Sequence, residues 1–164
     1  MTDSKDVMRH WDKIRENVGY LLVERGIPYA AASRMMGRSV NYLALFLASH
    51  IHKMPPETLE RLLDVLGVPL STLLREPKKL HWPLTPQELQ RAIRRLEALR
   101  RMKHMNRGEF SVWLGYNSKT SWSTICRGYK KPGKAMWAKI ESRTKIPLAR
   151  LIEEVRNENP IHRR

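Results

Sequence analysis

The sequence predicts an all-α fold made of two similar five-helix units in tandem. A pattern of apolar residues, glycines and prolines recurs 78 residues further along the chain, so that the segment 68–74 (VPLSTLL) returns as 146–152 (IPLARLI). Apolar residues follow helical spacing over most of the chain, and no segment shows the alternation that predicts a strand. A repeat of this length indicates two copies of one folded unit rather than a stack of short repeats.

The first unit is predicted to span residues 9–76. Gly26 is placed to end its first helix, Pro28 to open the second, and Ser39 to cap the third. Residues 1–8 are polar and expected to fray. The expected helices cover residues 11–25, 29–36, 40–49, 57–66 and 70–74.

The second unit is predicted to span residues 87–156, after a semi-rigid proline-rich linker over 77–86 and before a disordered tail over 157–164. Thr85, Pro86 and Glu88 have the spacing of a capping box with proline at the first helical position. Trp82 in the linker is expected to dock on one unit. The expected helices cover residues 88–103, 106–114, 119–127, 133–144 and 147–155.

The charge of the chain predicts a polyanionic partner. The formal net charge is +15. Residues 1–79 hold 12 Lys/Arg and 9 Asp/Glu, a net of +3, whereas residues 80–164 hold 19 and 7, a net of +12. Nucleic acid is favoured over a membrane, because the sequence has no long apolar run and no signal-like start. The second unit should therefore supply most of the phosphate neutralisation.

Each unit resembles the helix-turn-helix domain of the phage Cro/C1 repressor family, the XRE type. The segment 57–74 (ETLERLLDVLGVPLSTLL) is similar to the fourth and fifth helices of that family, and 125–132 (ICRGYKKP) to the end of its third helix and the next loop. The resemblance covers about residues 10–75 and 88–155. It implies two tandem lambda-repressor-like domains. The third helices match at an offset of 79, since Trp122 and Ile125 correspond to Leu43 and Phe46.

The resemblance implies that the third helix of the second unit enters the major groove of DNA, where each base pair shows a distinct pattern of donors and acceptors. Trp122 and Ile125 should face the core. The implied base-reading residues are Ser118, Lys119, Thr120, Ser121, Ser123, Thr124 and Arg127. The implied phosphate contacts are Asn106, Arg107, Asn117, Tyr129, Lys130, Lys131 and Lys134.

The third helix of the first unit is more apolar. Asn41 is its one strong candidate for reading a base, with Arg38 and Ser39 expected near phosphates. Val40, Tyr42, Leu45 and Leu47 are expected to be at least partly outward. Outward apolar residues usually mark a protein interface, which favours dimerisation or docking between the units. The alternative is contact with thymine methyl groups.

Three further features have alternative interpretations. The arginines on helix 88–103 form either a second phosphate-binding surface or, as we favour, a solvated face. Trp113, Trp122 and Trp137 are expected in the core rather than stacked on bases. Cys126, the single cysteine, is expected to be a partly buried and unreactive thiol. The stripe of arginines comprises Arg91, Arg94, Arg95, Arg100 and Arg101.

These observations predict a sequence-specific regulator that binds double-stranded DNA in the cytoplasm, at the nucleoid. The resemblance implies a repressor of a prokaryote or its phage. A homodimer is an open alternative. No catalytic or metal-ligand motif is present in the sequence, so we expect no enzyme activity, cofactor, metal or small-molecule ligand. Two rival functions remain open: a protein-interaction module of a mobile element, and RNA binding, which only the charge suggests.

Overall fold

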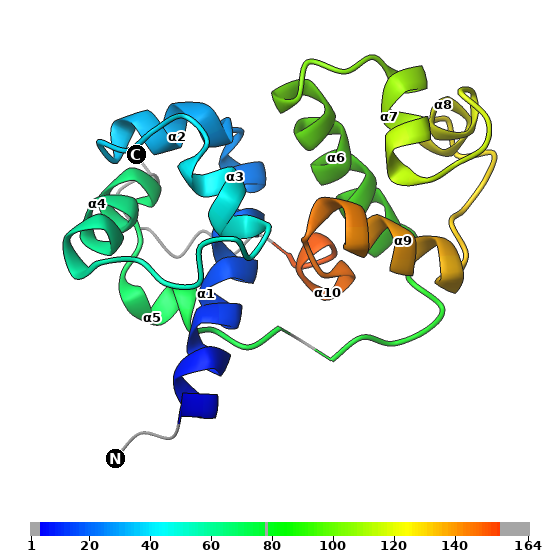
Figure 1. Ribbon diagram of the computed structural model, residues 1–164. Helices are drawn as coiled ribbons and strands as arrows, with labels where there is room; N and C mark the ends of the chain where they lie inside the picture. The colour runs from blue at the N-terminus through cyan, green and yellow to red at the C-terminus, as the bar shows by residue number, and fades with distance from the viewer. Residues whose placement is uncertain (1–3, 78, 155–164) are drawn as a thin grey trace, which may run out of the picture.

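The computed structural model describes residues 4–77 and 79–154, and every regular element in that part of the chain is an α-helix (Figure 1). The all-α prediction is thus confirmed for these residues. The first half contains α1 (Ser4–Arg25), α2 (Tyr29–Met35), α3 (Tyr42–Leu47), α4 (Pro56–Leu66) and α5 (Leu70–Leu73). The second half contains α6 (Pro86–Met102), α7 (Arg107–Leu114), α8 (Ser121–Cys126), α9 (Lys134–Thr144) and α10 (Leu148–Leu151). The predicted tail, 157–164, lies outside the described residues.

The helix bounds repeat with the register that the sequence predicts. Adding 78 to the bounds of α4 gives those of α9, and the same holds for α5 and α10. The bounds of α3 and α8 differ by 79. The second half therefore has one extra residue before its third helix, and the first half has one extra residue after it.

Helix starts follow the capping predictions at some positions and not at others. The capping box at α6 is confirmed, since the Glu88 N–H donates to Thr85 Oγ1 (3.1 Å) and the Thr85 N–H donates to the Glu88 carboxylate (2.9 Å). The prediction that Ser39 caps the third helix is wrong. Asn41 occupies that position. The backbone carbonyl of Ser39 accepts the backbone N–H of Tyr42 (3.0 Å) within the preceding turn.

The first helix begins earlier than predicted. It starts at Ser4, although fraying was expected as far as residue 8; residues 1–3 lie outside the described part. Once the turns after Trp11 are formed, each added residue gains one hydrogen bond without a new nucleation cost. This explains why a polar segment continues the helix.

The two halves pack side by side through α1, α6 and α10 (Figure 1). Gly19 on α1 allows a close approach, because a Cβ built there would lie 3.5 Å from both Leu47 of α3 and Ile146 after α9. The prediction that Leu47 is partly outward is wrong, since this residue is buried. Its side chain packs toward Gly19, so it contributes to contacts within the chain.

Arg95 joins the two halves and contradicts the solvated-face interpretation of helix 88–103. Only 2% of this residue is exposed. Its guanidinium donates to the Glu24 carboxylate (2.6 Å), the Leu151 carbonyl (2.6 Å) and the Tyr20 hydroxyl (3.1 Å). Asn17, which precedes Arg95 by 78 residues, donates to the equivalent Leu73 carbonyl in the first half (2.8 Å).

Other arginines of α6 are also engaged with the protein. Arg91 donates to the Ile152 carbonyl (2.9 Å), and Arg100 donates to Glu97 (2.6 Å) and the Met105 carbonyl (2.9 Å). Arg94 and Arg101 are exposed. The solvated-face prediction therefore fails at Arg91, Arg95 and Arg100. Tertiary packing brings the partners of Arg91 and Arg95 near, whereas Arg100 binds groups that are close in sequence. This leaves two exposed arginines on the helix.

Candidate nucleic-acid interface

The turn between α7 and α8 is connected to a buried serine. Ser111 Oγ donates to the backbone carbonyl of Ser118 (2.7 Å) and accepts the backbone N–H of Trp122 (3.2 Å). The N–H groups in the first turn of a helix have no partner within that helix. Ser111 supplies one, and so connects the start of α8 to α7.

The first half contains the same arrangement. Ser33 is buried on α2, donates to the Tyr29 carbonyl (2.7 Å) and accepts the backbone N–H of Leu43 (3.1 Å). Ser33 and Ser111 differ by 78 positions, and Leu43 and Trp122 by 79. One hydrogen bond thus places the third helix in both halves.

The inner face of α8 is apolar. Trp122 and Ile125 are fully buried, as the sequence predicts, and the Trp122 ring meets Phe110 edge to face at 5.3 Å. Trp137 is buried, and Trp113 is half-buried and stacked on Phe110 at 5.6 Å. The prediction that these tryptophans belong to the core is confirmed for Trp122 and Trp137, whereas Trp113 packs against the core and stays partly exposed.

The outer face of α8 is polar, and its helix is shorter than the predicted 119–127. Ser118 and Thr120 lie in the preceding turn, where their hydroxyls bond each other (2.8 Å), and Thr124 Oγ1 donates to the Thr120 carbonyl (3.0 Å). Three of the predicted base readers thus have structural hydrogen bonds. The exposed members of the predicted set are Ser118, Lys119, Thr120 and Arg127, and the half-buried ones are Ser121, Ser123 and Thr124.

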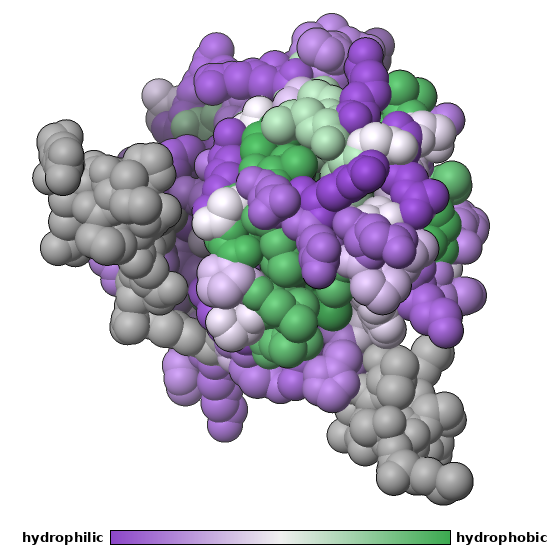
Figure 2. Space-filling view, turned by 90° about the vertical axis from the view of Figure 1, so that its left-hand side faces the viewer, coloured by the Kyte–Doolittle hydropathy of each residue, from purple (hydrophilic) through white to green (hydrophobic). Residues whose placement is uncertain are grey.

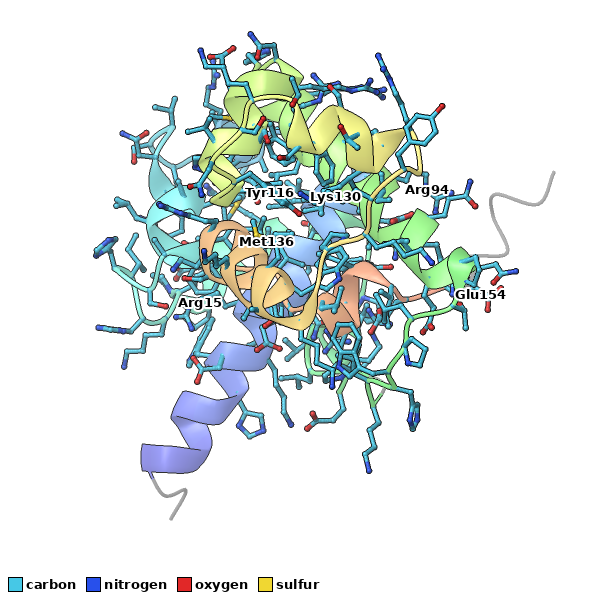
Figure 3. All side chains as sticks on the ribbon, turned by 90° about the vertical axis from the view of Figure 1, so that its right-hand side faces the viewer. Arg15, Arg94, Tyr116, Lys130, Met136 and Glu154 are labelled. Atoms are coloured by element: carbon cyan, nitrogen blue, oxygen red, sulfur yellow. The ribbon has the colours of Figure 1, made fainter. Side chains whose placement is uncertain are left out.

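A basic loop follows α8. Lys119, Arg127 and Lys131 are exposed, and none has an ion-pair partner among the described residues. Tyr129 is 82% exposed. The Lys130 ammonium lies 5.6 Å from the centre of the Tyr116 ring, and Figure 3 shows these two residues between α8 and α9.

Asn106, Arg107, Lys134 and Asn117 were also predicted at phosphates. Asn106 caps α7 by accepting the Glu109 N–H (2.8 Å), and Arg107 pairs with Glu97 (3.0 Å). The Lys134 ammonium lies 5.4 Å from the Trp82 ring, so the linker tryptophan contacts the second half, as expected of a docked residue. Asn117 is exposed in the turn before α8. Exposed cationic groups thus concentrate after α8 rather than at the start of α7.

The outer face of α3 differs from that of α8. Val40 and Leu45 are 45% and 42% exposed, and Tyr42 is half-buried. Ser39 and Asn41 are exposed, and the Asn41 side chain makes no capping hydrogen bond. The predicted phosphate contact Arg38 donates to Thr58 Oγ1 through Nε (3.1 Å), and its guanidinium lies 5.3 Å from the Tyr42 ring centre.

Two relevant residues were missed in the sequence. Met35 on α2 is 62% exposed, and Figure 2 shows that hydrophobic residues gather on the face of the first half seen there. The only sequence signal was an Ala- and Met-rich helix. Glu97 on α6 is buried among donors, and its signal was an acidic residue on the apolar side of an otherwise basic helix.

Comparison of the chain with protein-family models, with curated proteins and with solved structures finds no match. No helix in the described ranges is long and apolar enough to cross a membrane. In the same ranges, no three His, Cys, Asp or Glu residues come together as metal ligands.

Proposed function

We propose that each half is a helix-turn-helix domain like those of the Cro/C1 repressors, and that the chain binds double-stranded DNA as a sequence-specific transcriptional regulator. One observation carries the proposal. The polar outer face of α8 lies beside exposed cationic side chains that have no ion-pair partner within residues 4–77 and 79–154, while Trp122 and Ile125 anchor its inner face. Such a helix presents side chains to base edges, and the adjacent cations neutralise phosphates.

The contacts within the protein narrow the set of base readers. Lys119 and Arg127 have long cationic side chains that match the acceptors of guanine, O6 and N7. Ser121 and Ser123 lie on α8, between Lys119 in the preceding turn and Arg127 at its C-terminal cap. Ser118, Thr120 and Thr124 instead stabilise the turn and the helix through their own hydrogen bonds.

Phosphate contacts are assigned to Asn117, Tyr129, Lys130 and Lys131, which are exposed around α8. Lysines that neutralise phosphates release counterions and make binding salt-dependent. The net charge of +12 over residues 80–164 supports the second half as the main source of affinity. The first half then adds a weaker contact or a protein interface.

Selection of bound sequences from a random duplex pool tests the proposal. The full chain at moderate salt should enrich one box, or two boxes at a fixed spacing near one helical turn. Mirrored boxes would show a dimer on the DNA. Binding without enrichment would contradict sequence-specific regulation. It would leave only the electrostatic attraction between DNA and a chain with a net charge of +15.

A second candidate function is supported by α3. Leu45 on α3 and Val40 in the turn before it are exposed apolar residues. Residues 1–79 have a net charge of only +3, so this half repels a second copy or another protein least. Leu45→Glu should abolish such a contact. Sedimentation of the unchanged chain and of the Leu45→Glu variant measures self-association. An unchanged chain that is monomeric at high concentration and binds no protein partner would exclude this role.

A further inference from the structure

Glu97 places a carboxylate among donors from three helices. Only 8% of the residue is exposed. Its Oε2 accepts Arg100 Nε of the same helix (2.6 Å). Its Oε1 accepts Arg107 Nε of α7 (3.0 Å), and Trp122 Nε1 (3.0 Å) and Cys126 Sγ (2.9 Å) of α8. One oxygen atom therefore connects both α7 and α8 to α6.

The ionisation states support this arrangement. Burial on its own raises the pKa of Glu97, but hydrogen bonds from Cys126, Arg100 and Trp122, with the charge of Arg100, hold that pKa below its ordinary value. Burial, followed by the hydrogen bond to Glu97, raises the pKa of the Cys126 thiol to about 12. At neutral pH a carboxylate that only accepts thus faces neutral and cationic donors.

The contacts on α8 are the informative ones. Trp122 and Cys126 are four residues apart, so they lie on the same face of the helix. A helix of six residues is not stable on its own in water, so contacts with the rest of the protein must set its orientation. Two directional hydrogen bonds to one fixed oxygen define its rotation about its axis, and hence which residues point outward.

The equivalent positions in the first half are occupied differently. Subtracting the repeat offsets from Glu97, Trp122 and Cys126 gives Gly19, Leu43 and Leu47. There Leu47 packs toward the bare backbone of Gly19. At these positions, hydrogen bonds from the third helix to a carboxylate on the first therefore occur only in the half with the polar third helix.

We infer that Glu97 is a positioning residue for DNA reading: its carboxylate sets the orientation of α8 through Trp122 and Cys126. This inference rests on the proposed function. Base edges are read by side chains whose geometry must match, so a small rotation of α8 costs affinity for the selected sequence. Attraction to phosphates in general is unaffected by such a rotation.

Glu97→Gln tests the inference, with Glu88→Gln on the same helix as the matched control. Both variants remove one negative charge, so electrostatics alone predicts tighter DNA binding for both. We expect Glu97→Gln to bind the selected duplex about tenfold more weakly, the loss typical of one misplaced base contact. Its affinity for unrelated duplex should stay the same or rise, and Glu88→Gln should bind both duplexes at least as tightly as the unchanged chain does.

Cys126→Ala and Cys126→Ser form a gentler pair for the case in which Glu97→Gln does not fold. Alanine removes one donor to Oε1 without a change of charge, whereas serine keeps a hydroxyl donor. Alanine should weaken selected binding severalfold and serine should restore it. The Trp122 indole N–H resonance should shift in the Glu97→Gln and Cys126→Ala proteins, which reports the connection without DNA.

The outcomes separate the two claims. If Glu97→Gln binds the selected duplex as tightly as Glu88→Gln, or if Cys126→Ala is unchanged, the positioning role is overturned and the proposed function stands. If the unchanged chain enriches no sequence, the proposed function fails, and the role in DNA reading fails with it.

Discussion

The third helices of the two halves, α3 and α8, begin at the same hydrogen bond to a buried serine but differ in their other contacts and in the residues around them. Ser33 and Ser111 make the same hydrogen bond to the start of α3 and α8. Beyond that bond, α3 is held by packing of Leu47 toward Gly19 and by Arg15 of α1, which donates to the Phe46 carbonyl, whereas α8 is held by hydrogen bonds from its side chains to Glu97. Packing is not directional, whereas hydrogen bonds fix an orientation. Both halves thus have a directional bond to the third helix, but in the half expected to read bases it engages two side chains of that helix, whereas Arg15 reaches a backbone carbonyl near the end of α3.

The charged groups differ in the same sense. In the first half, Arg15 donates to the Phe46 carbonyl (2.7 Å), Arg38 to Thr58, and Arg61 to the Met36 carbonyl (3.1 Å). In the second half, Lys119 and Arg127 are exposed and have no ion-pair partner within the described residues. Arg15, Arg38 and Arg61 thus serve the fold of the first half, and the cations around α8 remain available to a ligand.

The largest expected effect concerns the junction between the halves. Arg95→Ala removes three hydrogen bonds and leaves Glu24 without its partner, so the free energy of unfolding should fall by about 3 kcal/mol. Urea denaturation measures the change. Arg94→Ala is the control, because that exposed neighbour should alter stability by less than about 0.5 kcal/mol. Equal losses would contradict the role assigned to Arg95.

The comparison between α8 and α3 becomes sharper with binding data. Lys119→Ala or Arg127→Ala should weaken binding to the selected duplex by about 1–3 kcal/mol, because each removes a base contact. Leu45→Ala on α3 should change it much less. Titrations with labelled duplex measure all three proteins. Unchanged affinity for both α8 variants would rule out this placement of the reading helix.

The shared serine bond should matter equally in both halves. Ser33→Ala and Ser111→Ala each leave a buried N–H, of Leu43 or Trp122, without its acceptor. Each should lower the free energy of unfolding by about 1–2 kcal/mol. Parallel urea titrations compare them, and a loss in one half alone would show that the halves do not share this device.

The smallest expected effect is that of a single phosphate contact. Lys131→Ala should weaken binding to all duplexes about equally and lower the slope of affinity against salt by about one. A salt series on the selected and an unrelated duplex provides the test. A loss confined to the selected duplex would assign Lys131 to base reading instead.

Sequence patterns predicted the features that depend on local order. The 78-residue repeat, the one-residue shift at α8, the capping box at Thr85 and the buried face of α8 are all recorded in nearby residues or in their recurrence. Periodicity and capping are local physical effects, so a single sequence carries them. The same signals placed Trp122 in the core.

The failures concern residues whose partners are distant in sequence. Arg95 looked like part of a solvated stripe, but Glu24, Tyr20 and Leu151 surround it. Periodicity predicted an outward Leu47, but its side chain packs toward Gly19, which Ile146 of the second half also approaches. Side-chain periodicity does not show which helices pack together, and the burial of both residues depends on that packing.

The central claim is that α8, and not α3, sets the DNA sequence that the chain prefers. Selection from a random duplex pool should be repeated with a Lys119→Ala, Arg127→Ala double variant and with a Val40→Ser, Leu45→Ser double variant. We expect the Lys119→Ala, Arg127→Ala variant at α8 to lose or change the enriched bases, and the Val40→Ser, Leu45→Ser variant at α3 to keep them. An α8 variant that enriches the original sequence, or an α3 variant that alone changes it, would contradict the account.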